Sequence, residues 1–419
     1  MKQISPSSPQ AGLFGAGHFR EFKSDPLGFL RRLAAEHGDF VGFLLGTRKY
    51  YLVSRPDLVR ALLIEEVSRL RKPGFVADSN RGHFGDGLTT LEEPEWQRRR
   101  TLIRRAFHVD DSAAFRPGSI TRACTLDWLA TLPREHPFDL RVAFRTLVAR
   151  IAARTLFDAE LEGYGRPDEN RQRTGIIPLA EAYGEDHTAV MTDEPVAPLS
   201  MTRPRASSAM PATLGIIDSR IKTREARGDV LSILIEANLE RAEIVGEIMQ
   251  MFFAGHLTTP SVLISLFHLL AEHPEVVARL RQEPSDGSLI ECALKETMRI
   301  HPPAPILYRE VAEPLSLGGF VLEPRDGVWI CPHLLHHDPR YFEAPERFLP
   351  ERFASGSERI PEYAYLPFGA GPRTCAGRRM AMQQMTTMAS LAVAWCDLVP
   401  MGDRAPAAFV ARDVPRPTD

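Results

Sequence analysis

A single cysteine lies among glycines in the segment PFGAGPRTCAG, residues 367–377. Glycines at 369, 371 and 377 permit backbone angles and close approaches that side chains would prevent. A helical pattern begins just after Cys375, so unpaired N–H groups and the positive end of a helix dipole are expected near its sulfur. That environment favours a thiolate, which is a metal ligand. A glycine-rich loop around a buried structural cysteine fits the same residues, so the pattern alone leaves both interpretations open.

A long apolar segment carries a second set of chemical groups. Residues 243–271, EIVGEIMQMFFAGHLTTPSVLISLFHLLA, predict one helix. Pro260 cannot donate to the carbonyl of His256 four residues back, so we expect a kink and a free carbonyl there. Gly255 removes a side chain one turn earlier. Together, Pro260 and Gly255 are expected to open a groove beside the kink.

Charged side chains form two further patterns. Glu296 and Arg299 lie on one face of a predicted helix, although most such pairs are exposed and stabilise by under about 1 kcal/mol. Residues 96–107 predict a basic amphipathic helix, and two more arginines follow the cysteine. The arginines of these two clusters are at positions 98, 99, 100, 104, 105, 378 and 379. A solvated face explains them as well as a binding surface does.

The elements that must position these groups are mainly helical. Residues 40–45 and 50–53 predict a β-hairpin, and residues 144–156 predict a helix. Residues 321–332 predict a strand, a turn and a second strand. A proline-rich stretch at 192–211 is expected to be a lid or a break between helices. The expected architecture is therefore helix-rich, with a smaller β portion at the two ends.

The composition excludes several classes of protein. The chain has 419 residues, of which 44% are hydrophobic and 25% charged, as in an ordinary globular protein. A formal charge of −3 gives no reason to expect nucleic acid or an anionic membrane as a partner. Five scattered cysteines predict no disulfide framework and favour the cytoplasm. The most apolar segment, residues 261–271, is too short to cross a bilayer, so no membrane anchor is expected.

The cysteine segment resembles the haem-binding loop of the cytochrome P-450 superfamily, FxxGxRxCxG. This resemblance implies that Cys375 is the axial thiolate of a haem b iron, to which it donates electron density that favours O–O cleavage. It also implies that Arg373 faces a haem propionate and that Phe368 packs near the sulfur. The residues of the expected haem loop are Phe368, Gly369, Gly371, Arg373, Cys375 and Gly377.

Three other motifs occur in the order of the same family. KETMR at 295–299 matches its ExxR motif, and PERFLPERF at 345–353 resembles its PxxFxPxRF segment. The resemblance implies a buried network of Glu296, Arg299 and Arg352. Trp96 and Arg100 match a WxxxR motif on a helix that reaches the haem edge, and Arg309 stands where many members place another propionate partner. We expect one cytochrome P-450 domain over residues 1–419, mainly α with a small β portion, and haem between the long oxygen-activation helix and the cysteine-loop helix.

The long helix departs from the family at one position. In the family, the groove AGx(D/E)T(T/S) holds dioxygen over the iron, and its acid helps to relay protons. Ala254, Gly255, Thr258 and Thr259 fit this pattern, but Leu257 stands in place of the acid. We therefore keep three alternatives: water replaces the acid and ordinary monooxygenation survives, His256 shuttles protons, or the chemistry is peroxide-driven or otherwise atypical. We favour the first. A haem-thiolate binding or sensing protein without turnover is a further alternative from a different class.

The expected substrate pocket is apolar, so a lipophilic substrate is favoured over a charged one. A terpenoid or polyketide-like metabolite of secondary metabolism is the first choice, and a fatty acid the second. Phe84 and residues 192–211 would supply the roof. A core position explains each of the pocket residues equally well when it is taken singly. The residues expected to line the pocket are Phe84, Phe252, Phe253, Ala254, Pro305, Ile306 and Leu307.

Two remaining features concern metals and partners. His333, His336, His337 and Asp338 suggest a metal site, but they also resemble the HxDP that follows a strand in this family, and we expect no second metal. The chain carries no reductase-like sequence, so electrons must come from a separate partner, which we expect to be a ferredoxin supplied by a ferredoxin reductase. The two arginine clusters would form its docking surface on the thiolate side of the haem. We expect a cytoplasmic monomer.

Overall fold

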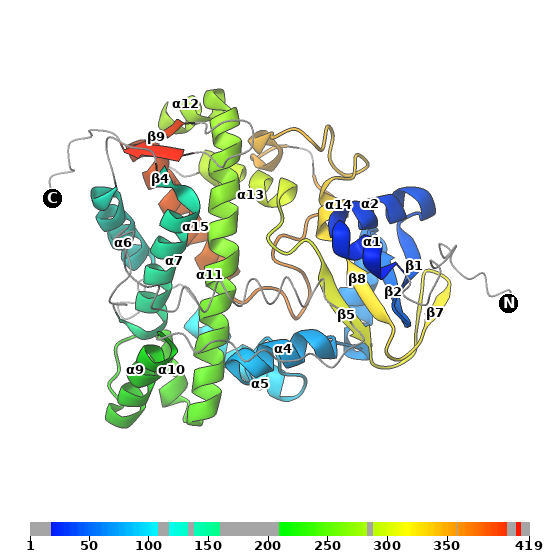
Figure 1. Ribbon diagram of the computed structural model, residues 1–419, viewed down its shortest axis with the longest axis horizontal. Helices are drawn as coiled ribbons and strands as arrows, with labels where there is room; N and C mark the ends of the chain where they lie inside the picture. Colours follow the sequence, from blue (N-terminus) through cyan, green and yellow to red (C-terminus); the bar gives the residue numbers. More distant parts are fainter. Residues whose placement is uncertain are drawn as a thin grey trace.

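The long central helix predicted from the sequence dominates the computed structural model, in which α11 (Arg241–Glu272) runs unbroken through Pro260 (Figure 1). A capping box between Glu240 and Glu243 fixes its start by pairing two free N–H groups. The structure describes residues 18–107, 117–132, 138–159, 209–282, 288–357, 359–399 and 408–411.

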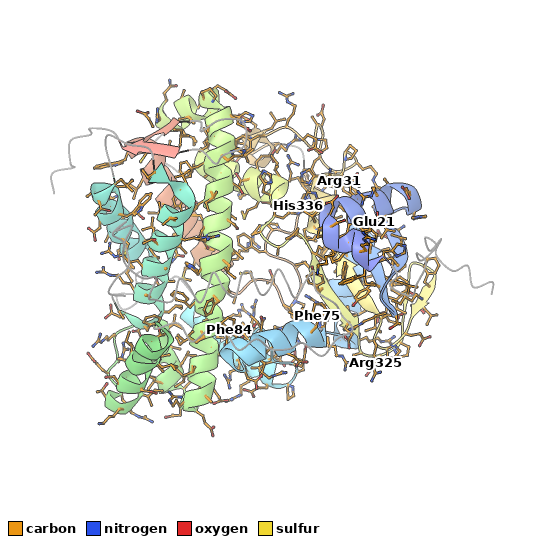
Figure 2. All side chains as sticks on the ribbon, in the orientation of Figure 1. Glu21, Arg31, Phe75, Phe84, Arg325 and His336 are labelled. Carbon is orange, nitrogen blue, oxygen red and sulfur yellow. The ribbon has the colours of Figure 1, made fainter. Side chains whose placement is uncertain are left out.

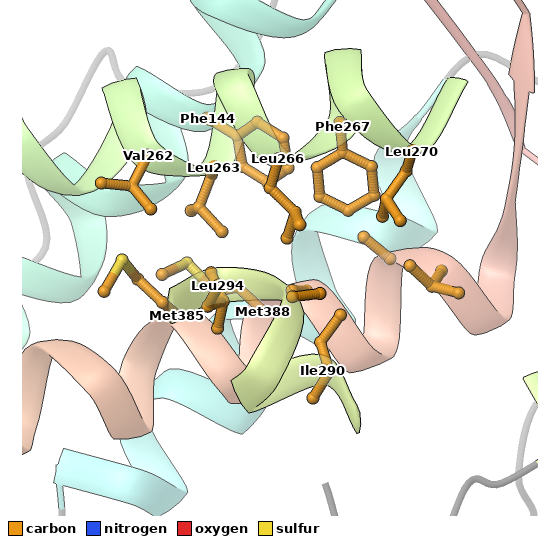
Figure 3. Packing of buried hydrophobic residues seen from close by; sticks show 14 of the residues in the cluster. Phe144, Val262, Leu263, Leu266, Phe267, Leu270, Ile290, Leu294, Met385 and Met388 are labelled. Carbon is orange, nitrogen blue, oxygen red and sulfur yellow. The ribbon is translucent and has the colours of Figure 1, made fainter. Parts of the chain in front are cut away.

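Helices from both halves of the chain pack around α11. Figure 3 shows apolar side chains of α11, α7, α13 and α15 meeting in one core, with Leu263, Leu266, Leu294 and Met388 all buried. This packing fixes α11 relative to the helix that follows the cysteine. The surrounding helices are α6 (Pro117–Thr131), α7 (Leu140–Phe157), α9 (Ala209–Thr223), α10 (Val230–Glu236), α12 (Pro274–Gln282), α13 (Ser288–Ile300) and α15 (Arg378–Trp395).

The burial of α11 accounts for its apolar composition. Within the described ranges it is the one helix long and apolar enough to cross a membrane, and 56% of its most apolar window is buried inside the protein. Its apolar residues are those of a core helix that has neighbours on several sides.

The main sheet of the β portion lies on the other side of α11 from α6 and α7 (Figure 1). This sheet has the strand order β1-β2-β8-β5-β3, in which β2 and β8 are parallel and the other neighbours antiparallel. The hairpin prediction is confirmed, because β1 pairs with β2 from Phe40↔Val53 to Leu45↔Arg48. The strands of this sheet are β1 (Phe40–Leu45), β2 (Arg48–Val53), β3 (Leu70–Arg71), β5 (Leu307–Val311) and β8 (Gly327–Ile330).

Two smaller sheets complete the β portion. One has the order β4-β10-β9 and the other pairs β6 with β7. The predicted strand, turn and second strand at 321–332 are confirmed as β7 and β8, although these two strands belong to different sheets. The reason is local: Gly318 and Gly319 both adopt positive φ and form a tight turn that pairs β7 with the preceding β6. The strands are β4 (Phe138–Asp139), β6 (Leu315–Leu317), β7 (Phe320–Leu322), β9 (Cys396–Val399) and β10 (Ala408–Ala411).

Short helices cover the sheet and lead toward α11. The basic helix is confirmed as α5, and the fold class expected from the sequence is confirmed as mainly α with a small β portion. The predicted lid at 192–211 falls almost entirely outside the described residues; only its last three begin α9. The remaining helices are α1 (Phe19–Ser24), α2 (Pro26–His37), α3 (Pro56–Arg60), α4 (Gly74–Phe84), α5 (Glu95–Ala106) and α14 (Pro332–His336), with a π-helix (Ala61–Glu65) and 3₁₀ turns (Val67–Arg69 and Pro350–Phe353).

Candidate active site

One face of α11 is open although the helix lies in the core. Ala254, Thr258 and Ser261, which are separated by four and three residues and so share a face, are all exposed. Gly255 beside them has no neighbouring atom within 4 Å of the position that a Cβ would take. The Thr258 hydroxyl donates to the Ala254 carbonyl at 2.8 Å. The described residues therefore leave room for a ligand beside the face of α11 that carries Ala254, Thr258 and Ser261.

The other residues of the AGHLTT motif point elsewhere. His256 is only 2% exposed, its ring stacks on Phe252 with the centroids 5.8 Å apart, and its position is about 200° around the helix from Thr258. Burial lowers the pKa of His256 to about 4, so its ring is neutral near neutral pH. Thr259 is buried as well, and Leu257 packs at the edge of an apolar cluster. His256 is thus poorly placed to deliver protons to the open face.

The loop before α15 is held in a fixed shape. The Cys375 N–H donates to the Phe368 carbonyl at 2.9 Å, which closes the loop. Gly369 and Gly371 have φ of 68° and 71°, a region that favours glycine. A Cβ on Gly371 would also clash with the Leu63 carbonyl oxygen. Phe368 packs with its side chain against the core shared by α11 and α15.

The Cys375 thiol departs from the sequence expectation. The side chain is accessible, yet burial among protein atoms raises the pKa of the Cys375 thiol, and the Gly377 N–H, Arg100 and Arg378 only partly offset this. Desolvation therefore opposes the effect of the helix start on this thiol when no metal ion is bound. A bound metal ion would supply the missing charge, since a coordinating thiol is deprotonated outright.

Positively charged side chains gather beside the cysteine loop. The guanidinium group of Arg373 pairs with the Glu92 carboxylate and donates to the Leu91 carbonyl at 3.2 Å. Burial and the charge of Arg373 lower the pKa of Arg309 to about 10 and that of Lys72 to about 7. These three basic side chains thus lie close together, with the Glu92 carboxylate near all of them and Glu247 near Lys72. This cluster would be stabilised by an anionic ligand.

Helix α5 supplies the second side of this region. Arg100 donates to the Thr374 carbonyl at 2.6 Å, next to Cys375. Trp96 is 5% exposed, and the Arg373 guanidinium carbon lies 4.6 Å from the centre of its ring. Trp96 and Arg100 of the WxxxR motif are therefore brought to the cysteine loop together.

These observations agree with the demands of haem. A haem carries two carboxylates, which match the excess positive charge of Lys72, Arg309 and Arg373, and its iron needs an accessible thiolate such as Cys375. The flat macrocycle needs an unfilled space, which the Gly255 side of α11 offers. The residues present therefore fit a haem between α11 and the cysteine loop.

The ExxR pair is a buried network. Glu296 and Arg299 are fully buried and joined by two hydrogen bonds of 2.7 and 2.8 Å. Arg352 reaches the same carboxylate at 3.2 Å. Arg299 also donates to the carbonyls of His336 and Arg347, which lie before the cysteine loop. The network therefore ties α13 to the segment that leads to Cys375.

The histidines near residue 336 have structural partners. His336 is fully buried, accepts from the Leu366 N–H at 2.8 Å, and has its pKa lowered by burial to about 3 (Figure 2). His337 bonds to the His333 carbonyl, and Asp338 pairs with Arg340. These groups hold the turn after α14 in place.

The expected pocket residues divide between the core and the open side. Phe252 is completely buried, and Phe253 stacks on Phe84, at the end of α4 nearest α11, with the ring centroids 4.2 Å apart (Figure 2). Ile306 packs into the core beneath the sheet. Leu307 alternates to the other face, near Gly369 of the cysteine loop.

Several polar residues of this region belong to no sequence motif. Lys72 lies in no motif, and its side chain donates to the Leu88 carbonyl at 2.8 Å. Glu92 pairs with Arg373 across 281 residues of sequence. Only the tertiary fold brings these residues together, so spacing along the chain gave no signal for them.

The family model described as Cytochrome P-450 matches residues 6–409. The chain therefore belongs to the cytochrome P-450 family and is a haem-containing monooxygenase, an oxidoreductase. It is 30% identical over 413 residues to cyclooctatin synthase of Streptomyces melanosporofaciens, which covers 92% of this chain and 88% of the relative. It is also 30% identical over 409 residues to cyclooctat-9-en-7-ol 5-monooxygenase of the same organism, covering 90% and 86%.

Proposed function

We propose that the protein oxidises, and most simply hydroxylates, a lipophilic terpenoid or polyketide-like metabolite of secondary metabolism. Two features together carry this proposal. One is the open face of α11 at Ala254 and Thr258, and the other is the accessible Cys375 with basic side chains around it. One monooxygenase relative is named for an unsaturated alcohol, cyclooctat-9-en-7-ol, which supports an apolar substrate with few polar groups.

In this proposal the haem is haem b, and Cys375 is its axial ligand. Haem iron with a thiolate ligand supplies the activation of O₂ from which one oxygen atom enters the substrate. Lys72, Arg100, Arg309 and Arg373 would hold the propionates and exclude water from that edge. Their surroundings support this role, because these basic side chains are buried or half-buried and have few carboxylates nearby.

The residues of α11 would handle protons. Thr258 holds a hydroxyl proton at the open face, at present directed to the Ala254 carbonyl. Leu257 can neither donate nor accept a proton, and His256 lies on the opposite side of the helix. We therefore propose that water delivers protons to Thr258, and that ordinary monooxygenation proceeds more slowly than with an acid at position 257.

Electrons would come from a ferredoxin and its reductase in the cytoplasm, with the protein acting as a monomer. Arg104, Arg378 and Arg379 are exposed and could receive an acidic partner. Arg99 does not belong to this surface, because it is 3% exposed and paired with carboxylates. Arg98 is engaged by Glu95. The docking surface is thus smaller than the sequence suggested.

The missing acid at position 257 favours one competing function, a peroxide-driven oxidation.

The experiment that separates the two functions begins with a titration of the purified haem protein with terpenoids, polyketide fragments and fatty acids, followed by the Soret band. Compounds that give a saturable low-spin to high-spin shift are then incubated with a ferredoxin and its reductase, or with hydrogen peroxide alone. Product that requires the electron donor supports the proposal, product formed only with peroxide supports the alternative, and tight binding without product under either supply contradicts both.

A further inference from the structure

The first six residues of the connection between α4 and α5, residues 85–90, form a loop that is seated directly on α11. Gln250 accepts from the Thr89 N–H at 2.9 Å and from the Thr89 hydroxyl at 2.6 Å, and donates to the Gly85 carbonyl at 2.7 Å. One turn earlier, Glu247 accepts from the Leu88 N–H at 3.1 Å. Two side chains of α11 therefore hold three residues of this loop by their backbones.

Glycines allow the loop to come this close. A Cβ on Gly246 would clash with the Asp86 carbonyl, and a Cβ on Gly87 would lie 2.8 Å from the side-chain carbon of Gln250. The first contact would be shorter still, and real Cβ atoms show neither distance. A glycine in the helix and a glycine in the loop therefore allow the two segments to approach each other.

The charge of Glu247 is compensated from α5. Glu247 is fully buried, and Arg99, itself 3% exposed, lies 3.2 Å from it. Arg99 also pairs with Glu243 and Glu95, so that the buried carboxylate is tied to α5 as well as to the loop. A buried carboxylate needs such partners, because an unpaired one would be costly.

The same loop borders the space beside the cofactor cations. Lys72 donates to the Leu88 carbonyl at 2.8 Å, while Glu247 holds the N–H of the same residue. Leu88 thus lies between the cation cluster and α11, and its side chain is only partly buried in the cluster that includes Leu257. Gln250 is one helical turn from the exposed Ala254. The loop therefore lies on the same side of α11 as Ala254, one turn toward the start of the helix.

We propose that Glu247 and Gln250 are positioning residues that fix the 85–90 loop and thereby determine which substrates the enzyme accepts. They act through Leu88 and Thr89 and do not touch the reacting atoms. This role rests on the proposed function, because it requires a haem-bound substrate space beside Leu88. Burial raises the pKa of Glu247 to about 7, and the Leu88 N–H, Arg99 and Lys72 oppose this shift. The charge of Glu247, which strengthens its tether to the loop (its hydrogen bond to the Leu88 N–H), therefore depends on these neighbouring groups.

The test uses the haem-loaded protein and two probes of different reach. Imidazole binds haem iron without extending far from it, whereas 1-phenylimidazole extends into the space above it. The ratio of their dissociation constants, measured from the Soret shift, reports the shape of that space. Amide hydrogen exchange of residues 85–91 reports the loop directly and does not depend on the haem.

The variants remove the same contact from opposite sides. Gln250→Leu deletes the three hydrogen bonds described above and a longer one of 3.4 Å to the Thr90 hydroxyl. Thr89→Val deletes only the Thr89 hydroxyl, which guards against a variant that fails to fold. Glu272→Gln, an exposed carboxyl on the same helix, is the matched control. We expect faster exchange of the loop amides and a change of about fivefold in the probe ratio for Gln250→Leu, with a smaller change for Thr89→Val and none for Glu272→Gln.

Each other outcome overturns part of the account. Faster exchange with a probe ratio within about twofold of wild type would show that the loop is tethered but sets no specificity. Unchanged exchange would overturn the tether itself. Absence of any azole-induced shift in the wild-type protein would overturn the proposed haem site, and with it the specificity role, while the exchange data would still decide the tether.

Discussion

At the scale of single residues, Leu257 separates this chain from the pattern it otherwise follows. Thr258 lies on the open face of α11, whereas His256, one of the candidate proton donors, is buried on the opposite side. The substitution therefore removes an acid without any visible replacement on α11 next to Thr258. The sequence identified this residue because it lies inside a motif of fixed spacing.

Leu257→Asp is expected to speed turnover and leave the product unchanged. A carboxyl beside Thr258 would relay protons, and a positioned acid contributes up to 10²–10⁴-fold, so we expect a rise of roughly tenfold. Product and consumed electrons are measured together with a ferredoxin and its reductase. Leu257→Asn is the control, because it adds polarity without an acid. Loss of activity or a changed product would contradict the view that only the acid is missing.

Glu247 predicts a pH dependence of stability. Burial raises its pKa from 4.5 to about 7, so between these values the folded protein holds a proton that the unfolded chain has released. The free energy of unfolding therefore falls as the pH rises through this window, by at most about 3 kcal/mol. Glu247→Gln does not titrate and should gain stability relative to wild type from pH 4.5 to 7.5 in urea unfolding. A constant difference between the two proteins across this range would contradict the assignment.

At the scale of elements, buried charge joins segments that are far apart in the sequence. Glu296 on α13 pairs with Arg299 and Arg352, and Arg99 on α5 pairs with Glu247 on α11. The first network was predictable from two motifs. The second was not, because Arg99 is one of several arginines with similar spacing and only the packing of α5 on α11 shows which one is buried.

Arg299→Ala is expected to destabilise the fold by about 3–5 kcal/mol, because it leaves Glu296 buried without its bidentate partner. Arg352→Ala should cost less, since Arg299 still pairs with Glu296 and Arg352 is partly exposed. Urea unfolding and haem content measure both effects. An equal loss in the two variants would show that Arg299 is not the dominant partner.

At the scale of the whole molecule, the sequence predicted the fold class and the central helix but not all of the connections. The β1–β2 hairpin and α11 follow from local periodicity and turn residues. The place of β8 beside β2 depends on pairing between strands that are far apart in the sequence, which local patterns do not encode. Lys72 and Glu92 reach the cation cluster for the same reason, through tertiary contacts alone.

The charged surface offers a test of how electrons enter the molecule. Arg104→Glu together with Arg378→Glu is expected to slow reduction by an acidic ferredoxin about tenfold or more at low salt, because steering by opposite charge is lost. Arg359→Glu, an exposed arginine outside both clusters, is the control. The difference should shrink at high salt as charges are screened. Stopped-flow reduction that is unchanged at low salt would exclude this surface as the docking site.

The most direct test of the account is the absorption spectrum of the reduced, carbon monoxide-saturated protein, compared between wild type and Cys375→Ser. The account predicts that wild type shows the long-wavelength Soret band of a thiolate-bound haem and that Cys375→Ser loses it. Retention of haem by the variant is expected, because Lys72, Arg100, Arg309 and Arg373 would still bind the carboxylates. A wild-type protein without that band, or a variant that keeps it, would contradict the assignment of Cys375 as the haem ligand.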